Sequence, residues 1–385
     1  MEGAIHSPAA PRHPGGALLV HTVVHLAVYD AVVAVEGGYR PYATRVDAPE
    51  GADMRAAVAT AAHRSARARL EPSQVAAFDD RYAAFMSGIP DGPGKLAGTA
   101  AGEAAAVGML EQRVNDRFGR TVLYECSAEP LPVGEFEPDG GCGTQPIGVA
   151  VGQTVPYTFD DQSQFRPDGP DPLSSPEWAA DFEEVKAYGG AGSTVRTPEQ
   201  TDVVHFWNEH GYVHWNRNLI ALAADYDLDV VETARLMALV HAAASDAVIA
   251  GLEAKYHYRF WRPRTAVPRA AEDGNPATEP DPAWKPLLTV DHPEYPSGHS
   301  FWSGAVTRAV ALFLGTEDVR WTIRTVHPEV VTTGRTYEDI DALMHDVSDA
   351  RVWGGLHYRN SMEDGRALGD EVARFVAERF FVPEP

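Results

Sequence analysis

Cysteine is nearly absent from this sequence, which limits the kinds of site that it can form. Only Cys126 and Cys142 occur among the 385 residues, both in a stretch rich in glycine and proline. The pair is compatible with a disulfide or with two reduced thiols, so it does not identify a cellular compartment. Two cysteines at this spacing exclude a cysteine-based zinc site.

Basic residues are also in short supply. The chain has 32 lysines and arginines against 55 aspartates and glutamates, which gives a formal net charge of −23 at pH 7. A surface of this charge repels nucleic acids and anionic membranes, so we expect neither as a partner. Any local cluster of cations therefore runs against the overall charge and indicates a specific anion site.

Long uncharged apolar runs are missing as well. The first apolar stretch, residues 17–35, contains His21, His25 and Asp30, which is typical of an amphipathic helix. No run reaches the roughly 18 residues that a membrane span requires, and residues 1–16 lack the features of a signal peptide. We therefore expect a soluble protein, cytoplasmic unless the natural chain begins further upstream. The sequence is compatible with a homo-oligomer.

Alanine-rich segments with helical periodicity predict an all-α helical bundle. The expected helices span residues 16–36, 53–70, 73–87, 94–116, 178–188, 198–225, 228–255, 300–315, 337–352 and 361–381. Ser73 is the expected N-cap of the third helix, and Gly92-Pro93 breaks the chain before the fourth. The expected long loops are residues 118–180 and 262–295. We expect a single domain over residues 1–385, with N-terminal helices and a wrapping loop in 1–190 and the site-bearing helices in 191–385.

Three short segments carry the side chains that an oxyanion site needs. The first runs from Lys255 to Arg262, the second is Pro-Ser-Gly-His at residues 296–299, and the third runs from Arg351 to His357. Together they offer three cations, a hydroxyl and two imidazoles. An oxyanion needs donors on every side, because each oxygen must replace the water that it loses on entering the protein.

The local setting of these residues favours convergence on one anion. Residues 297–299 precede a predicted helix, and the amides at a helix N-terminus attract anions. Arginine offers a planar fork of donors that stays charged, which suits Arg262 and Arg351 as clamps. The Gly354-Gly355 pair lets the chain turn between Arg351 and His357, so that both can face one ligand. Asp346 and Asp349 are the expected partners that orient the Arg351 guanidinium.

At this point the chain resembles the vanadium-dependent haloperoxidases and the acid phosphatases of the type 2 phosphatidic acid phosphatase superfamily. Their shared pattern is Lys, six residues, Arg-Pro; then Pro-Ser-Gly-His; then Ser-Arg, five residues, His. The first two segments match completely, and the third has Ala350 in place of serine. Stretches that begin at His25, Gln164, Glu184 and Arg196 also look like the bacterial haloperoxidase-like branch. The resemblance covers residues 16–380 and implies the helical bundle of that family.

The resemblance implies vanadate as the cofactor. The expected ligands of its equatorial oxygens are Lys255, Arg262, Ser297, Gly298 and Arg351. His357 would be the vanadium ligand, and His299 would be the acid–base residue near the apical oxygen. Hydrogen peroxide and a halide would be the substrates, with a small organic molecule as acceptor, and Lys255 would polarise the bound peroxide.

The same pocket also suits phosphate. In that interpretation His357 attacks the phosphorus of a phosphate ester to form a phosphohistidine, while His299 protonates the leaving alcohol and no vanadate is needed. Chain length favours the haloperoxidase, because stand-alone phosphatases of this type are usually shorter. A non-catalytic anion-binding scaffold is a third alternative, which the presence of both histidines disfavours.

Two positions bear on the halide. The resemblance places Leu252 where the fungal chloroperoxidase type has tryptophan. It places His292 where that type has phenylalanine and the algal bromoperoxidase type has histidine. We therefore expect His292 in the halide and peroxide environment, and bromide or iodide to be preferred over chloride.

Other histidines have simpler interpretations. His205, His210 and His214 lie at helical spacing, but a glycine after His210 interrupts the helix. We expect these three to be packing and surface residues rather than metal ligands. The remaining histidines of apolar helices are expected in the core or at an interface, and they are His21, His25 and His241.

Overall fold

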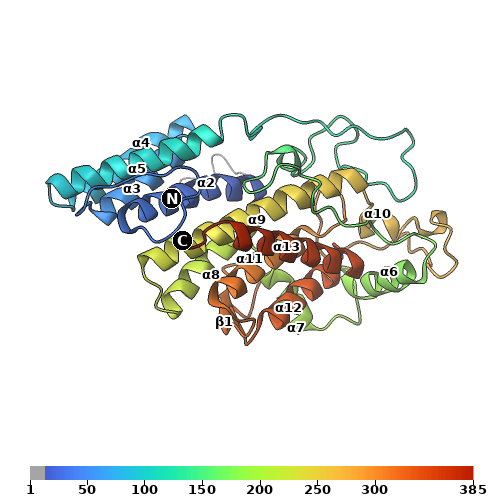
Figure 1. Cartoon of the computed structure of the whole chain (residues 1–385). Helices are drawn as coiled ribbons and strands as arrows, with labels where there is room; N and C mark the ends of the chain where they lie inside the picture. Colours follow the sequence, from blue (N-terminus) through green and yellow to red (C-terminus); the bar gives the residue numbers. More distant parts are fainter. Residues whose placement is uncertain (1–13, 385) are drawn as a thin grey trace. The chain divides into compact units, whose positions relative to one another are not determined.

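The computed structural model describes residues 14–384, and the predicted all-α class is confirmed (Figure 1). The chain forms two compact units, each built from separate stretches. The first comprises residues up to Asp116, Leu219–Ser245 and the residues from Arg374 onward. The second comprises Arg117–Asn218 and Asp246–Ala373. The expectation of a single domain over residues 1–385 stays a prediction.

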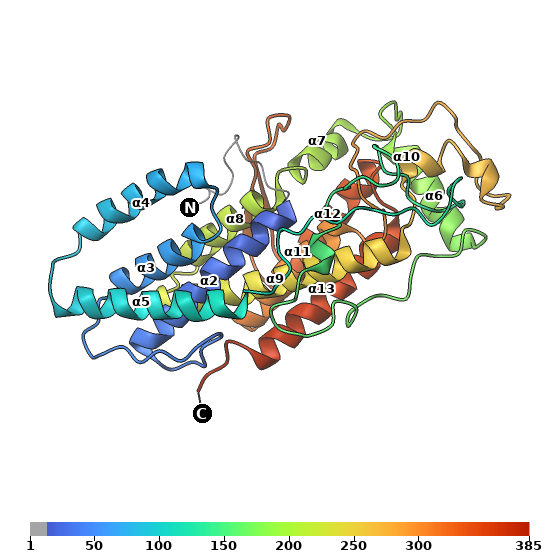
Figure 2. The same cartoon turned by 90° about the horizontal axis from the view of Figure 1, so that it is seen from above.

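The first unit is centred on helices that lie side by side in both views (Figures 1 and 2). Its complete helices are α2 (Pro14–Glu36), α3 (Met54–Arg67), α4 (Pro72–Ser87) and α5 (Pro93–Gln112). Glycines of α5 allow its close approach to α3. A Cβ at Gly98 would lie 2.2 Å from the Asp53 carbonyl oxygen, and one at Gly102 would lie 2.3 Å from that of Ala57. No larger residue fits at these two positions without moving the α3 backbone.

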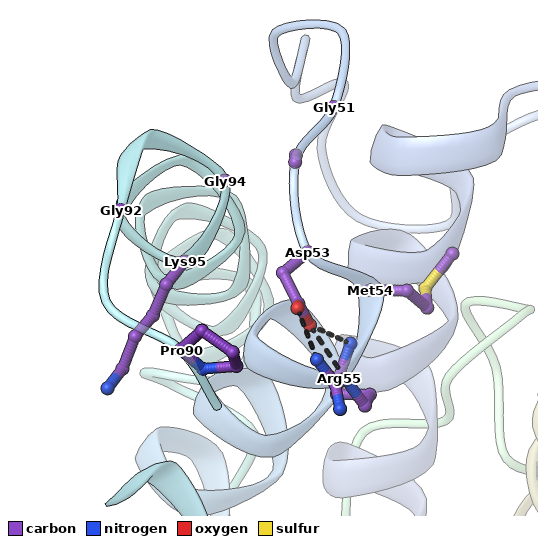
Figure 3. A pocket seen from close by; sticks show the side chains of 9 residues that line it. Gly51, Asp53, Met54, Arg55, Pro90, Gly92, Gly94 and Lys95 are labelled. Atoms are coloured by element: carbon purple, nitrogen blue, oxygen red, sulfur yellow. Dashed lines mark hydrogen bonds and ion pairs between the residues drawn. The ribbon is translucent and has the colours of Figure 1, made fainter. Parts of the chain in front are cut away.

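Local capping sets where these helices begin. The Asp53 side chain accepts hydrogen bonds from the backbone N–H groups of Arg55 (2.9 Å) and Ala56 (3.1 Å), which starts α3 (Figure 3). The expectation that Ser73 caps α4 is wrong. Glu71 is the N-cap, because Pro72 suits the first helical position and Gln74 completes a capping box. Gly92 and Pro93 separate α4 from α5 as predicted.

The pocket drawn in Figure 3 lies at the starts of α3 and α5. The residues that line it are 51–55, Pro90, Gly92, Gly94 and Lys95. Its acidic side chain, Asp53, is already committed to capping α3 and to an ion pair with Arg55. None of the side chains expected to bind an oxyanion lines this pocket.

Two of the three histidines predicted in the core or at an interface are buried in the first unit. His21 and His241 are 0% and 2% exposed, and the partly buried His25 ring lies against that of His241, with 4.0 Å between centroids and 33° between planes. The Nδ1 atom of His241 lies 2.8 Å from the carbonyl oxygen of Met237, one turn earlier in its helix. Burial lowers the pKa of His241 to about 4, and burial followed by His241 itself lowers that of His25. These imidazoles are therefore neutral in the folded protein at neutral pH.

Acid is expected to destabilise the protein through His241. The unfolded chain takes up a proton near the ordinary histidine pKa of 6.5, whereas the folded chain does so only near pH 4. The contribution of His241 to the free energy of unfolding is therefore fully present above pH 6.5. It falls by up to about 3 kcal/mol as the pH drops to 4. The free energy of unfolding, measured with urea at pH 7.5, 6 and 5, should depend less on pH in His241→Leu than in the wild type. Asp30, whose pKa is raised to about 6 by burial, titrates in both proteins and cancels in this comparison. Equal pH dependence in the two proteins would contradict the assignment.

The second unit holds the remaining helices. They are α6 (Pro176–Gly189), α7 (Pro198–Phe206), α10 (Pro263–Ala266), α11 (Gly298–Leu314), α12 (Ile340–Trp353), and parts of α8 (Gly211–Asp225), α9 (Val230–Tyr258) and α13 (Arg359–Arg379). The single helix predicted over 198–225 is wrong, because the chain leaves helical geometry after Phe206 and begins a new helix at Gly211. An antiparallel hairpin of β1 (Trp321–Arg324) and β2 (Gly334–Tyr337) was not predicted.

Close helix contacts fix the start of α11. A Cβ at Gly251 of α9 would lie 2.3 Å from the Phe301 ring, so this glycine provides the space that the ring fills. A Cβ at Gly369 of α13 would lie 2.3 Å from the carbonyl oxygen of Phe301. Both glycines therefore let α9 and α13 press against the first turns of α11. This packing fixes the N-terminus of α11, which the sequence analysis predicted to bind an anion.

The loop over residues 118–180 is tied down at several points. Cys126 and Cys142 form a disulfide with 5.5 Å between their Cα atoms, which settles the alternative that the sequence left open. Further along, Asp246 of α9 accepts hydrogen bonds from the backbone N–H groups of Tyr157 (2.6 Å) and Thr158 (2.9 Å). The loop also covers Leu252, which is 5% exposed.

Two helices are long and apolar enough to cross a membrane by length and composition alone. They are α2 and α9, with mean hydropathies of 1.9 and 1.4 over their most apolar windows. The shares of these windows that are buried within the protein are 78% and 94%. Core helices of soluble proteins have this combination of apolar composition and burial.

Candidate functional site

The two cations of the first motif point at the backbone of the segment before α11. Lys255, 0% exposed near the end of α9, donates from Nζ to the carbonyl oxygens of Pro293 (3.0 Å) and Glu294 (2.8 Å). Arg262, 1% exposed, donates from Nε to the carbonyl oxygen of His292 (2.7 Å) and from Nη2 to that of Pro293 (3.1 Å). The carbonyl groups of residues 292–294 thus fix both cations in one place.

The second motif forms the start of α11. Ser297 is the N-cap, yet its side chain makes no capping hydrogen bond. Its Oγ is buried and has no hydrogen-bond partner within residues 14–384. A Cβ placed on Gly298 would lie 3.8 Å from Cε of Lys255, so the first turn of α11 faces the lysine side chain. An uncommitted hydroxyl and the helix N-terminus therefore stand beside a buried cation.

The third motif turns back on itself as its glycines predict. Gly355 has a φ of 73°, and the backbone N–H of Leu356 donates to the carbonyl oxygen of Arg351 (3.1 Å), which is the pattern of a Schellman C-cap. A Cβ at Gly355 would lie 2.4 Å from the Gly189 carbonyl oxygen, so no other residue fits there. The turn brings His357 back toward the same region as Arg351.

The Arg351 guanidinium is buried and largely unpaired. The residue is 4% exposed, and its Nε and Nη1 atoms lack hydrogen-bond partners in the part of the chain that the structure describes. The expectation that Asp346 and Asp349 orient it is wrong. Asp346 accepts from Nε1 of Trp207 (3.0 Å), and Asp349 pairs with Arg359 (2.8 Å). On a helix, residues five and two positions before Arg351 point about 140° and 160° away from it, so neither carboxylate reaches the guanidinium.

Glu294 is the residue that the sequence analysis missed. It is 0% exposed, and its Oε1 lies 2.7 Å from Nδ1 of His357 and accepts a hydrogen bond from the backbone N–H of Tyr358 (3.1 Å). An ionised Glu294 accepts from both groups, and Arg262 Nη1 can only donate to Nε2, so these contacts favour the tautomer of His357 with the proton on Nδ1. The lone pair then resides on Nε2, which lies 3.4 Å from Nη1 of Arg262. In the sequence, Glu294 is marked only by its position, three residues before Ser297. Its closeness to the three cations is visible only in the structure.

The two other histidines lie at the edge of this group. His299 is partly exposed, and its ring forms a hydrogen bond with the main chain of Trp207. Burial, followed by the charge of Arg351, lowers the pKa of His299 well below 6.5, so the ring is neutral and can accept a proton. His292, also partly exposed, has its Nδ1 atom 2.8 Å from Nη2 of Arg262.

Positive charge exceeds negative charge at this buried position. Burial lowers the pKa of Arg262 to about 10 and, with the charge of Arg262, that of Arg351 to about 9. Burial followed by the two guanidinium groups lowers the pKa of Lys255 well below its ordinary value. Burial raises the pKa of Glu294 to about 7, so one carboxyl group faces three cations. An anion bound among them would offset the excess and keep all three cations protonated.

The donor set fits a tetrahedral or trigonal-bipyramidal oxyanion such as vanadate or phosphate. The uncommitted atoms are a hydroxyl oxygen and two guanidinium nitrogens, all buried and all able to donate to an oxygen. An imidazole nitrogen with a free lone pair lies in the same group, and a neutral second imidazole lies at its edge. The three segments of the sequence thus meet at one position, with Glu294 added by the fold.

Comparisons with known proteins agree with the resemblance that the motifs indicated. Residues 235–381 match the family model of the VCPO second helical-bundle domain. The vanadium chloroperoxidase of Curvularia inaequalis is 28% identical over 193 residues, which cover 41% of this chain and 31% of that protein. The chain therefore spans less than a third of the length of this curated relative.

Two solved structures share the fold over nearly the whole chain. A bacterial vanadium-dependent iodoperoxidase superposes with a TM-score of 0.81 at 21% identity, covering 98% of this chain and 94% of the other. The holo form of a bacterial vanadium-dependent chloroperoxidase superposes with a TM-score of 0.76 at 19% identity, with the same coverage. This chain thus has the helical fold of these two enzymes.

Proposed function

We propose that this protein is a vanadate-dependent haloperoxidase, which uses hydrogen peroxide to oxidise a halide and thereby halogenates a small organic acceptor. The observation that carries the proposal is the set of buried, uncommitted donors on Ser297 and Arg351. They lie in one group with Lys255, Arg262 and an imidazole nitrogen of His357 that carries a lone pair. A structural arginine or serine at such a depth is normally hydrogen-bonded within the protein.

The residues divide the work by their chemistry. His357 would bind the central atom through Nε2, because Glu294 holds the proton on Nδ1. The donors to the equatorial oxygens would be Lys255, Arg262, Ser297, Gly298 and Arg351. Bound vanadate would supply the activation of hydrogen peroxide toward attack by a halide. His299, neutral at neutral pH, would accept a proton from incoming peroxide and return it to the leaving oxygen.

The halide preference rests on two side chains. Position 252 carries leucine where the resemblance to the fungal chloroperoxidase type places tryptophan, so an aromatic ring is missing at this position. Nδ1 of His292 lies 2.8 Å from Nη2 of Arg262 and the side chain is partly exposed, which supports a role for this imidazole in the peroxide and halide environment. We therefore propose bromide or iodide as the substrate in preference to chloride.

The disulfide between Cys126 and Cys142 favours an oxidising compartment over the cytoplasm.

A paired assay tests the proposal. Purified protein, freed of bound anions, is measured with and without vanadate for peroxide-dependent bromination, iodination and chlorination, and for hydrolysis of a phosphate monoester. We expect halogenation only with vanadate, with bromide or iodide faster than chloride. Hydrolysis that vanadate inhibits, without halogenation, would instead establish the phosphatase alternative. If neither halogenation nor hydrolysis is detected but vanadate binds measurably, the protein is an anion-binding scaffold.

A further inference from the structure

A second cluster of polar side chains lies in the same unit, apart from the oxyanion group. His205 in the last turn of α7, with His327 and Glu329 in the loop between β1 and β2, brings three ligand atoms within 4.8 Å of one another. The His205 and His327 rings are stacked with 5.7 Å between centroids and 23° between planes. The sequence had grouped His205 with other histidines of its own segment, whereas the fold pairs it with a loop more than a hundred residues later.

The cluster is not an ordinary ion pair. Nδ1 of His205 lies 3.2 Å from Oε2 of Glu329, but it is buried and makes no hydrogen bond to any residue that the structure describes. A histidine that served only to bind the carboxylate would direct an N–H at it. Instead, a ring nitrogen and a carboxylate oxygen face the same small volume, which is the arrangement that a shared cation requires.

The donor types select the kind of cation. Two imidazoles and one carboxylate suit a divalent transition ion, whereas calcium and magnesium prefer oxygen ligands alone. Ligand atoms around a tetrahedral zinc ion lie about 3.4 Å apart, given bonds of about 2.1 Å. The distance of 3.2 Å between Nδ1 of His205 and Oε2 of Glu329 already matches this spacing, and the 4.8 Å limit for all three atoms leaves at most a small movement of the loop that carries His327 and Glu329.

We propose that His205, His327 and Glu329 bind a divalent transition-metal ion, for which Zn²⁺ is the probe. Three protein ligands leave the fourth position of a tetrahedral ion to water. The ion would join the loop of residues 325–333 to the end of α7. Asp202 of the same helix already holds this loop by accepting a hydrogen bond from the backbone N–H of Val331 (2.5 Å).

The location of the cluster links it to the oxyanion group. Two residues after His205, the main chain of Trp207 forms the hydrogen bond with the His299 ring. An ion that fixes the end of α7 would therefore restrict movement of the backbone that His299 contacts. This consequence rests on the proposed function, but metal binding itself does not, because none of the three ligands belongs to the oxyanion group.

Isothermal titration calorimetry tests the binding directly. The protein is treated with a chelator, exchanged into a buffer that does not coordinate metals, and titrated with zinc acetate. We expect one site per chain, and at least about tenfold weaker binding in His327→Ala and in Glu329→Gln, since even outer partners of metal ligands have effects of this size. His345→Ala, which removes an exposed histidine of α12, is the matched control and should bind zinc like the wild type.

Hydrogen–deuterium exchange provides the second measurement. Zinc should slow amide exchange in residues 325–333 of the wild type and leave exchange unchanged in His327→Ala. Calcium at the same concentration should have no effect on either protein. Equal zinc affinity in the wild type and both ligand variants would overturn the proposal, as would zinc binding that leaves the exchange of this loop unaltered. Neither result would bear on halogenation or on vanadate binding, so the two proposals can fail separately.

Discussion

Replacing His357 with alanine is expected to abolish halogenation and to weaken vanadate binding by more than about a hundredfold. The physical reason is that Nε2 of His357 is the atom of the group with a lone pair free for the central atom of an oxyanion, since Glu294 holds the proton on Nδ1. Loss of an outer partner of a metal ligand already costs about 10- to 100-fold in affinity, and loss of the ligand itself removes the bond. Binding is measured by vanadate titration monitored by ⁵¹V NMR, and activity by peroxide-dependent bromination.

Controls separate this effect from misfolding. His357 is buried, so the alanine variant creates a cavity, and His357→Gln serves as a variant closer in volume that still lacks the imidazole. Both variants should keep the circular dichroism spectrum of the wild type. His345→Ala should retain full activity. A His357→Ala protein that halogenates like the wild type would show that the axial assignment is wrong.

Replacing Glu294 is expected to have the second largest effect. In Glu294→Ala, Nδ1 of His357 loses its closer partner and keeps only the Ser361 hydroxyl at 3.4 Å, so the ring can rotate or change tautomer and present N–H to the ligand. We expect vanadate affinity to fall about 10- to 100-fold, the range observed for partners of metal-binding histidines. Glu294→Gln keeps a carbonyl oxygen at the same position and should recover part of this loss.

A readout of the histidine itself distinguishes orientation from general stability. The ¹⁵N chemical shifts of His357 report which ring nitrogen carries the proton. We expect the Nδ1-protonated form in the wild type and in Glu294→Gln, and a mixture in Glu294→Ala. If Glu294 served only to stabilise the fold, the alanine variant would unfold at lower temperature while its tautomer and vanadate affinity stayed unchanged.

Much of the helical framework was predictable because its determinants are local. A side-chain cap marks the start of α3, α6 and α7, and α6 and α7 also have proline at the first helical position; these signals lie within four residues of the boundary. The failures also have local causes. At α4 the N-cap is Glu71 and not Ser73, because Pro72 takes the first helical position. Between Phe206 and Gly211 the chain leaves the helix, although the spacing of the surrounding residues is helical.

The candidate site was predictable to a different extent. Spacing within each motif identified the cations, the serine and the histidines, because each motif lies on one turn or one helix end. The partners of these side chains were not predictable in the same way. Asp346 and Asp349 lie near Arg351 in sequence but on other faces of α12, whereas Glu294 lies 63 residues from His357 and is its hydrogen-bond partner.

The sequence alone determined which chemical groups are present and which short segments carry them, since charge, glycine placement and helix starts are properties of neighbouring residues. Only the tertiary structure decided which groups share a volume. It set Glu294 against His357, left Nε and Nη1 of Arg351 without a hydrogen-bond partner among residues 14–384, and brought His205 close to His327 and Glu329. The reason is that hydrogen bonding and charge compensation depend on distances of a few ångströms, and packing between helices far apart in the chain fixes those distances.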